Sequence, residues 1–208
     1  MLEAVLFDWN NTLVSFTWDD DLLVAGHRAG LGRDDPAFTE RYRATVFDRV
    51  GEDYATILRE LGVEDPDAFI DAEHEVWRPA HEVLGAAQAL LEVLRERGLK
   101  TALAIKPWPE PARTVRADVE RFGLAQLFDT LSFEGVDPAL RELKVEPEAA
   151  MYIGNRIEPD VQRAAQAGMT TVQALWFVAD DQPPGVEPDF QAFTPMDVLN
   201  IARRVAGR

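Results

Sequence analysis

Hydrophobic and polar positions follow two different rhythms along the chain. The first apolar run, at residues 3–8, predicts a short buried strand that ends on an acid, Asp8. The long stretch behind it has apolar residues at helical spacing, is punctuated by glycines and Asp-Pro pairs, and shows no alternating strand pattern. We therefore expect amphipathic helices at 18–31, 35–50, 53–61 and 66–77.

After Pro79 the pattern changes, and short apolar runs alternate with helical stretches. Strands are predicted at 99–105, 130–133, 149–153 and 170–175, helices at 83–97, 110–122, 158–167 and 195–205, and a loop rich in proline and aspartate at 180–192. Because parallel strands need helical crossovers, this alternation predicts an α/β fold with a doubly wound parallel sheet. We expect a core domain at 1–14 and 79–208, and a separate helical domain at 15–78.

Composition narrows the classes of function. The chain has 208 residues, of which 47 % are hydrophobic, and it contains no cysteine, which excludes disulfides, thiolate catalysis and cysteine-based zinc sites. A formal net charge of −16 repels phosphate backbones and anionic lipids, so we expect no nucleic-acid partner and no membrane association. The lack of cysteine and of a basic leader segment is consistent with a cytoplasmic protein.

Candidate chemistry lies at the ends of two predicted strands. Open parallel sheets bind ligands at the carboxyl ends of their strands, where Asp8 and the Gly154–Asn155 turn both fall. A carboxylate at a strand tip can act as a nucleophile in phosphoryl transfer, which also requires Mg²⁺, a general acid and a nearby cation. Asp160, in the first turns of the next helix, could project into the same crevice.

Two spaced motifs carry a resemblance to a known family. AVLFDWNNTLV at 4–14 is similar to a strand that ends in D-x-D-G-T-L/V. GNRIEPD at 154–160, followed by AAQAGMTTV at 164–172, is similar to G-D-x-x-x-x-D followed by a helix ending in A-G-M and a strand. Segments 98–106 and 133–138 match two further motifs by position only. The chain thus resembles the haloacid dehalogenase-like (HAD) superfamily, in the subclass with an inserted helical cap. The resemblance implies a HAD-like Rossmannoid core with 15–78 as an all-helical cap.

The resemblance also implies a role for each matching position. Asp8 would be the nucleophile and a metal ligand. Residue 10 would bind Mg²⁺ through its main-chain carbonyl and supply the general acid and base through its side chain, which here is that of Asn10. Asn155 occupies the place of a direct acidic metal ligand, and Asp160 would support the metal. Thr12 would either bind phosphate or hydrogen-bond within the loop.

This chain departs from the family at several of these positions. The amide of Asn10 cannot transfer a proton, and general acid–base help is worth about 10²–10⁴-fold in rate. Asn155 removes a negative charge that Mg²⁺ prefers in its ligands, so the metal should be bound more weakly. Ile105 stands where the family has a phosphate-binding Ser or Thr, and the family's lysine after the third strand has no counterpart.

Two cations near the motifs are candidates for phosphate binding, Lys106 and Arg156. One alternative is that they pair with Asp8 and Asp160 in place of Mg²⁺. Another is that Lys106 replaces the missing lysine. Both could equally be solvated, as loop cations usually are.

Three functional hypotheses follow. The first is a HAD-like hydrolase homologue with an eroded site and little or no phosphatase activity, which acts by binding a small phosphorylated ligand or a protein partner. The second is a slow, Mg²⁺-dependent phosphomonoesterase with Asp8 as nucleophile. The third is metal-independent chemistry like that of the haloacid dehalogenases, which also lack an acid two residues after the nucleophile. The cofactor is accordingly Mg²⁺ at a weakened site, or none.

The histidines and tryptophans are expected to be structural. The histidines, at positions 27, 74 and 81, are scattered over predicted helices without metal-ligand spacing, and we expect surface or packing roles for them. The tryptophans expected to pack are Trp9, Trp18, Trp108 and Trp176. Of these, Trp9 and Trp108 flank the presumed crevice and are also candidates for stacking on a ligand.

Overall fold

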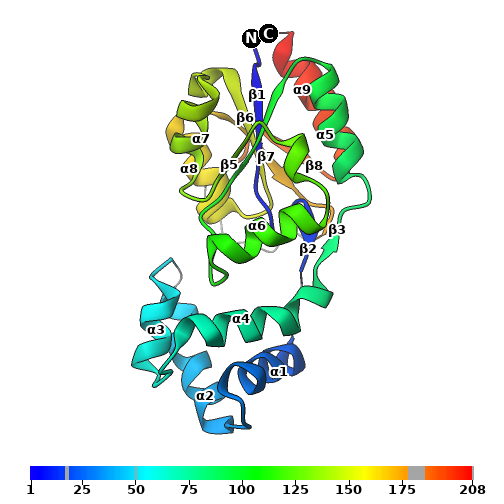
Figure 1. The fold of residues 1–208 in the computed structure, drawn as a ribbon. Coiled ribbons are helices and arrows are strands. Elements are labelled where there is room, and N and C mark those ends of the chain that lie inside the picture. Colours follow the sequence, from blue (N-terminus) through cyan, green and yellow to red (C-terminus); the bar gives the residue numbers. More distant parts are fainter. Residues whose placement is uncertain (17–18, 50, 178–185, 208) are drawn as a thin grey trace. The chain divides into compact units, whose positions relative to one another are not determined.

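The computed structural model describes residues 1–16, 19–49, 51–177 and 186–207. Contacts within the chain divide it into two compact units (Figure 1). The first unit consists of Met1–Ser15, Glu82–Ile105 and Phe122–Arg208, and the second of Phe16–His81 and Lys106–Arg121. The domain boundaries expected from the sequence, with 15–78 as a cap, stay a prediction.

A parallel six-stranded sheet forms the centre of the first unit, with strand order β5-β4-β1-β6-β7-β8. This confirms the predicted doubly wound α/β fold. The strands are β1 (Ala4–Phe7), β4 (Lys100–Ala104), β5 (Thr130–Ser132), β6 (Ala150–Gly154), β7 (Thr170–Ala174) and β8 (Phe190–Ala192). The helices of this unit are α5 (Ala87–Glu96), α7 (Val136–Leu143), α8 (Gln162–Ala167) and α9 (Pro195–Ala206).

Helices cover both faces of this sheet (Figure 1). Successive residues of a strand point to opposite faces, and Ala4 and Leu6 of β1 pack in one cluster with Leu140 of α7 and Ala164 of α8. Helices α5 and α9 lie on the opposite face (Figure 1). Because β1 is buried on both faces, its side chains are all apolar, and its sequence shows a continuous apolar run instead of an alternation.

Some short elements of the first unit were not expected from the sequence. The strands β2 (Val14–Ser15) and β3 (Glu82–Val83) pair antiparallel, and β8 lies in the stretch predicted as a loop, part of which falls outside the described residues. Strands of two or three residues are too short to show a period. Helix α7 was missed because Asp137-Pro138 resembles a break, although proline is tolerated in a first helical turn.

The second unit is helical. Its helices are α1 (Asp20–Leu31), α2 (Pro36–Thr45), α3 (Tyr54–Glu60), α4 (Pro66–Trp77) and α6 (Ala112–Arg121). An aspartate precedes each of the first four helices, and its carboxylate accepts a hydrogen bond from a main-chain N–H of the first turn. The four predicted helices are therefore confirmed, with shifted ends. The predicted helix at 35–50 ends at Thr45 and is followed by a 3₁₀ turn at Phe47–Arg49, while Trp18 lies outside the described residues.

Helix α1 packs closely against α4 because it carries a glycine, Gly26, at the contact. A Cβ atom at Gly26 would lie 2.6 Å from Nε1 of Trp77 and 3.0 Å from Cγ of Glu73. The indole of Trp77 donates to the main-chain carbonyl of Leu22 at 3.3 Å. An apolar cluster that includes Phe38, Tyr42 and Trp77 forms the core around this contact.

The histidines have the packing role, one of the two expected from the sequence, because all three are buried. Each also faces a carboxyl group, which the sequence did not predict. His27 is 2 % exposed, its Nδ1 lies 2.9 Å from Oγ1 of Thr39, and its Nε2 lies 3.7 Å from Oε1 of Glu73. Glu73 in turn accepts a hydrogen bond from the hydroxyl of Tyr54 at 3.0 Å. Burial raises the pKa of Glu73 well above its ordinary range.

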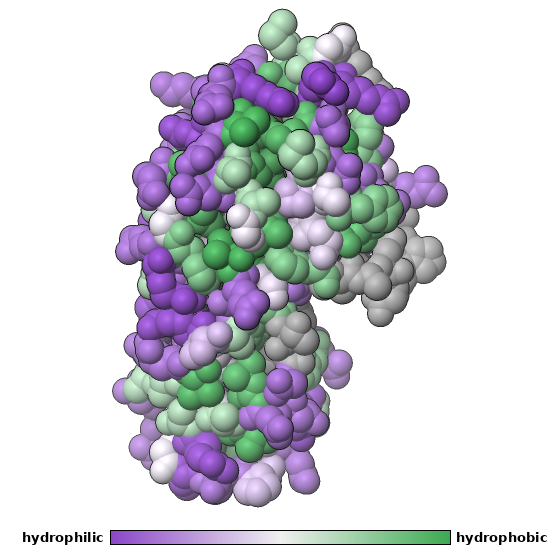
Figure 2. Space-filling model, turned by 90° about the vertical axis from the view of Figure 1, so that its right-hand side faces the viewer, coloured by the Kyte–Doolittle hydropathy of each residue, from purple (hydrophilic) through white to green (hydrophobic). Residues whose placement is uncertain are grey.

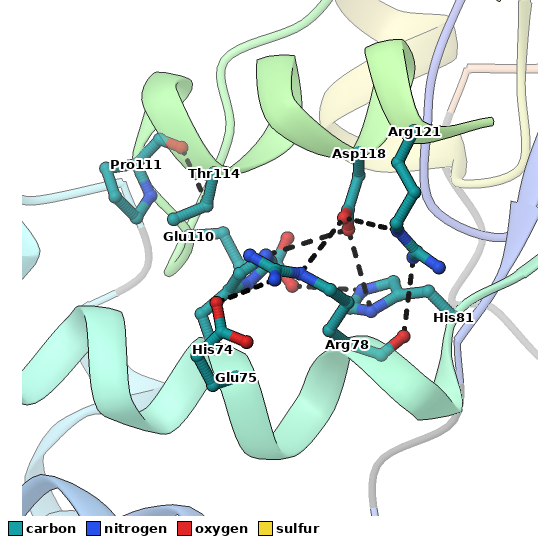
Figure 3. A network of polar contacts seen from close by, with 9 residues as sticks. All are labelled: His74, Glu75, Arg78, His81, Glu110, Pro111, Thr114, Asp118 and Arg121. Atoms are coloured by element: carbon teal, nitrogen blue, oxygen red, sulfur yellow. Dashed lines mark hydrogen bonds and ion pairs between the residues drawn. The ribbon is translucent and has the colours of Figure 1, made fainter. Parts of the chain in front are cut away.

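The other two histidines belong to a second polar cluster between α4 and α6 (Figure 3). Nε2 of His81 lies 3.2 Å from Oε1 of Glu110, and Nε2 of His74 lies 3.7 Å from Oδ2 of Asp118. Asp118 also pairs with Arg121 at 3.1 Å. The two histidines and the two carboxyl groups are buried, whereas Arg121 is exposed. Each buried carboxyl group therefore faces nitrogen atoms of other side chains, which makes burying polar residues of α4 and α6 less costly.

The face of the molecule drawn in Figure 2 shows hydrophobic residues interspersed among hydrophilic ones. The large hydrophobic side chains exposed in the described part of the chain include Phe193 and Met196, at 63 % and 62 %. None of the helices in the described residues is long and apolar enough to cross a membrane.

His27 predicts an acid-sensitive contribution to stability. Burial lowers its pKa from 6.5 to about 4, and the charge of Arg43 acts in the same direction. The unfolded chain therefore binds a proton that the folded chain does not, and stability is lost as the pH falls from about 6.5 towards 4. We expect the free energy of unfolding of the wild type, relative to His27→Gln, to fall by on the order of 2 kcal/mol over that window.

Chemical denaturation across this pH range measures the difference. Thr39→Val is the matched control, because it removes the hydrogen-bond partner of His27 and keeps the titrating group. Parallel curves for the wild type and His27→Gln would contradict the prediction.

Candidate active site

Asp8 lies directly after β1, at the carboxyl end of the sheet. Its main-chain N–H donates to the carbonyl of Ile153 on the adjacent strand β6 at 2.8 Å, which continues the parallel ladder by one residue. Its side chain is 6 % exposed, and Oδ2 accepts a hydrogen bond from Oγ1 of Thr12 at 3.2 Å. The carboxylate is therefore fixed in place from both the backbone and the loop that follows.

That loop, residues 9–14, is a tight turn around one main-chain carbonyl. The N–H groups of residues 12, 13 and 14 all donate to the carbonyl of Trp9. Asn11 adopts a left-handed conformation with φ 56°, a region that asparagine tolerates better than most residues. The family motif has glycine at this position, so the turn is preserved although the residue differs.

The second loop of the site follows β6. Gly154 allows the chain to turn back closely, because a Cβ atom there would lie 2.8 Å from Cβ of Asp160. Oδ2 of Asp160 accepts from the main-chain N–H of Arg156 at 3.3 Å and from Nε of the same residue at 3.4 Å. The side chain of Arg156 is 49 % exposed, whereas Asn155 and Asp160 are buried.

The amide of Asn155 connects the two loops. Its nitrogen donates to Oδ2 of Asp8 at 3.2 Å and to the main-chain carbonyl of Asn10 at 3.0 Å, since the opposite orientation would turn the amide oxygen toward two acceptors. The end of the Asn155 side chain thus lies between a carboxylate and a carbonyl. These are two of the groups that the family resemblance implies as metal ligands.

The electrostatics of the site show a shortage of positive charge. Burial, and then the charge of Asp160, raise the pKa of Asp8 from 3.8 to about 8, although Arg156 opposes them. The same burial, with Asp160 and Asp8, raises the pKa of Tyr152 well above its ordinary range. Two carboxyl groups therefore share one half-exposed guanidinium.

The residues present fit a Mg²⁺ ion. Among the described residues no group of three or more His, Cys, Asp and Glu side chains could hold a metal, so a metal would also need an amide and a main-chain carbonyl. Asp8, the Asn10 carbonyl and Asn155 already converge, and a half-turn of the Asn155 amide would present its oxygen to the same point. Oxygen donors of this kind suit Mg²⁺, and a cation would offset the two acids.

The first unit brings together most of the residues predicted from the sequence. Asp8 lies at the end of β1, and the loop after it holds Asn10 and Thr12. The loop after β6 holds Asn155, Arg156 and Asp160. Lys106 is exposed and belongs to the second unit, and its suggested role stays a prediction.

Sequence reasoning missed one side chain that reaches this loop. Nε1 of Trp176 donates to the main-chain carbonyl of Thr12 at 3.0 Å, although Trp176 was expected only to pack. It lies two residues beyond β7, so its place at a strand end was the available signal. Trp9 is buried and packs on Phe122, with ring centroids 6.2 Å apart, which confirms that it packs.

Comparison with known proteins identifies the family. Residues 2–168 match the model of the haloacid dehalogenase-like hydrolases. The chain belongs to this family. That result confirms the resemblance carried by the first and last motifs.

Similar proteins match nearly the whole length of the chain. A curated relative named glyceraldehyde 3-phosphate phosphatase, from Methanopyrus kandleri, is 28 % identical, and the match covers 99 % of each chain. Among solved structures, a HAD phosphatase from Thermococcus onnurineus matches with a TM-score of 0.70 at 20 % identity, covering 96 % of this chain and 97 % of that one. A putative β-phosphoglucomutase from Thermotoga maritima matches with a TM-score of 0.64 at 19 % identity, covering 98 % and 100 %. These structures show the HAD fold.

The raised pKa of Asp8 predicts how the metal-free protein responds to pH. The folded chain holds a proton on Asp8 that the unfolded chain releases, so this stabilising term is lost as the pH rises from about 4 through about 8. In EDTA, Asp8→Asn should gain stability relative to the wild type across that range. Each pKa unit corresponds to about 1.4 kcal/mol, or about 3–6 °C in Tm for a chain of this size.

Thermal denaturation of both proteins at several pH values measures this difference. Asp129→Asn serves as a control, because Asp129 is a half-exposed carboxylate paired with Arg95 outside the site. A difference in Tm between wild type and Asp8→Asn that is constant with pH would contradict the prediction.

Proposed function

We propose that this chain is a phosphomonoester hydrolase that uses Asp8 as its nucleophile. The observation that carries the proposal is the buried Asp8 carboxylate at the end of β1, oriented by Thr12 and faced by Asn155 from the loop after β6. The match to a phosphatase over the full length of both chains supports the same reaction class. We infer a small phosphorylated substrate, and a triose phosphate is the first compound to test.

The residues divide the reaction between them. An oxygen of Asp8 attacks phosphorus, and the bond from phosphorus to the leaving oxygen breaks as the acyl phosphate forms. The leaving oxygen takes its proton from water, because the amide of Asn10 cannot act as an acid at neutral pH. A water molecule then attacks phosphorus, which releases phosphate and restores the Asp8 carboxylate.

Charge in the site is balanced by two kinds of group. Mg²⁺, when bound by Asp8, the Asn10 carbonyl, the Asn155 amide oxygen and Asp160, would neutralise charge on the phosphoryl oxygens. Arg156 contributes the cation of the chain itself. Its contacts with Asp160, at 3.4 and 3.5 Å, are longer than charge-assisted hydrogen bonds usually are, so its half-exposed guanidinium is available to a phosphate.

The other hypotheses remain outcomes of the tests. An eroded homologue that only binds a ligand or a partner would fold and bind without turnover. The two amides, Asn10 and Asn155, favour that idea, and the comparisons with known proteins do not support it. A dehalogenase-like hydrolase would release chloride from a 2-halo acid without metal. Each of these differs from a phosphatase in a simple assay.

The first test is turnover of p-nitrophenyl phosphate with and without Mg²⁺, for the wild type and Asp8→Asn. We expect Mg²⁺-dependent turnover in the wild type and a loss of at least about 10³-fold in the variant, because the nucleophile is removed. Glu142→Gln, on α7, is a control for the loss of one acid elsewhere in the same unit. Equal rates for Asp8→Asn and wild type would reject Asp8 as the nucleophile.

The second test restores the missing acid. Asn10→Asp should raise kcat by about 10²-fold for an alkyl phosphate, whose leaving alkoxide needs a proton. The gain should be much smaller for p-nitrophenyl phosphate, because p-nitrophenolate leaves without protonation. The ratio of the two gains is the measurement, and Asn11→Asp, one residue away in the same turn, is the matched control. Similar gains with both substrates would contradict an acid role for position 10.

A further inference from the structure

Loop 9–14, which follows Asp8 and contains Thr12, accepts hydrogen bonds from two other loops at its main-chain carbonyls. The carbonyl of Asn10 accepts from the Asn155 amide at 3.0 Å, and the carbonyl of Thr12 accepts from the indole of Trp176 at 3.0 Å. The first donor follows β6 and the second follows β7, so two neighbouring strands each send one N–H group to this loop. The two bonds are chemically different in one respect that matters for catalysis.

The Asn155 hydrogen bond can be given up when the amide turns over, whereas the Trp176 hydrogen bond cannot be reversed in this way. An amide can turn its oxygen toward a cation, and Asn155 then no longer donates to the carbonyl of residue 10. An indole has a donor and no acceptor, so Trp176 can only donate. The bond to the Thr12 carbonyl therefore persists whether or not the amide turns.

The position of Trp176 is itself fixed by the sheet. The preceding residue, Leu175, donates its main-chain N–H to the carbonyl of Ala192 at 2.8 Å, which anchors the end of β7 to the edge strand β8. The indole is rigid and has only two side-chain torsions to immobilise. Through Trp176, the edge of the sheet thus fixes the position of loop 9–14, which contains Thr12, the hydrogen-bond donor to Asp8.

We propose that Trp176 is a positioning residue for catalysis, holding loop 9–14 so that Thr12 keeps Asp8 oriented when the Asn155 amide turns away. The effect on rate rests on the proposed phosphatase function, while the effect on the loop does not. The indole differs from other side chains in bulk as well as in its N–H group, so the test has to separate the two.

Trp176→Phe removes the N–H group and keeps an aromatic ring. Trp77→Phe is the matched control, because Trp77 also donates its indole N–H to a main-chain carbonyl, in the helical unit. Hydrogen exchange followed by mass spectrometry reports on the amides of residues 12–14, which are bonded to the Trp9 carbonyl. We expect their exchange to accelerate about five- to tenfold in Trp176→Phe and to be unchanged in Trp77→Phe.

Kinetics on p-nitrophenyl phosphate supply the second readout. Trp176→Phe should lower kcat by about tenfold with KM within about twofold, because a misplaced carboxylate still leaves the binding groups intact. Unchanged exchange at residues 12–14 overturns the proposal, as does faster exchange with an unaltered kcat. If exchange is faster in Trp176→Phe but the wild type shows no turnover, the proposed function is overturned. The anchoring of the loop by Trp176 would then still stand.

Discussion

The parallel pairing of β1 with β6 is the constraint on which the candidate site depends. The N–H of Asp8 bonds to the carbonyl of Ile153, so the ladder continues one residue past the last residue of β1. This register brings the Asp8 loop and the loop at 154–160 to the same edge of the sheet at the same height. A slip of one residue would turn the Asp8 side chain to the other face and separate it from Asn155.

The two amides at this edge change the charge of the site more than its shape. An asparagine fills nearly the same space as an aspartate, so the loops keep the arrangement of the family while the site loses two negative charges. In the structure, the Asn155 amide donates into the space between Asp8 and the carbonyl of residue 10. The amide N–H group therefore stabilises the Asp8 carboxylate and the Asn10 carbonyl, as a bound cation would. Arg156 does the same for Asp160 by pairing with it.

The helical unit has its own core and its own polar interior. Histidine–carboxylate contacts are buried there in two clusters, one around Glu73 and one around Asp118 (Figure 3). Buried ionisable groups persist only where each finds a partner or loses its charge. This explains why a helix with an amphipathic sequence pattern, such as α4, can bury Glu73 and His74 as well as apolar residues.

The sequence by itself determined the larger elements, the class of fold and the family. Apolar runs and helical spacing are local properties, and Asp-capped helices or motifs such as 4–14 and 154–160 need only neighbouring residues. Only the tertiary structure decided the direction of the Asn155 amide, the raised pKa of Asp8 and the bond from Trp176 to Thr12. These depend on atoms that are distant in the chain and on burial, since a pKa or a hydrogen bond is set by everything that surrounds a group, and no local pattern encodes that surrounding.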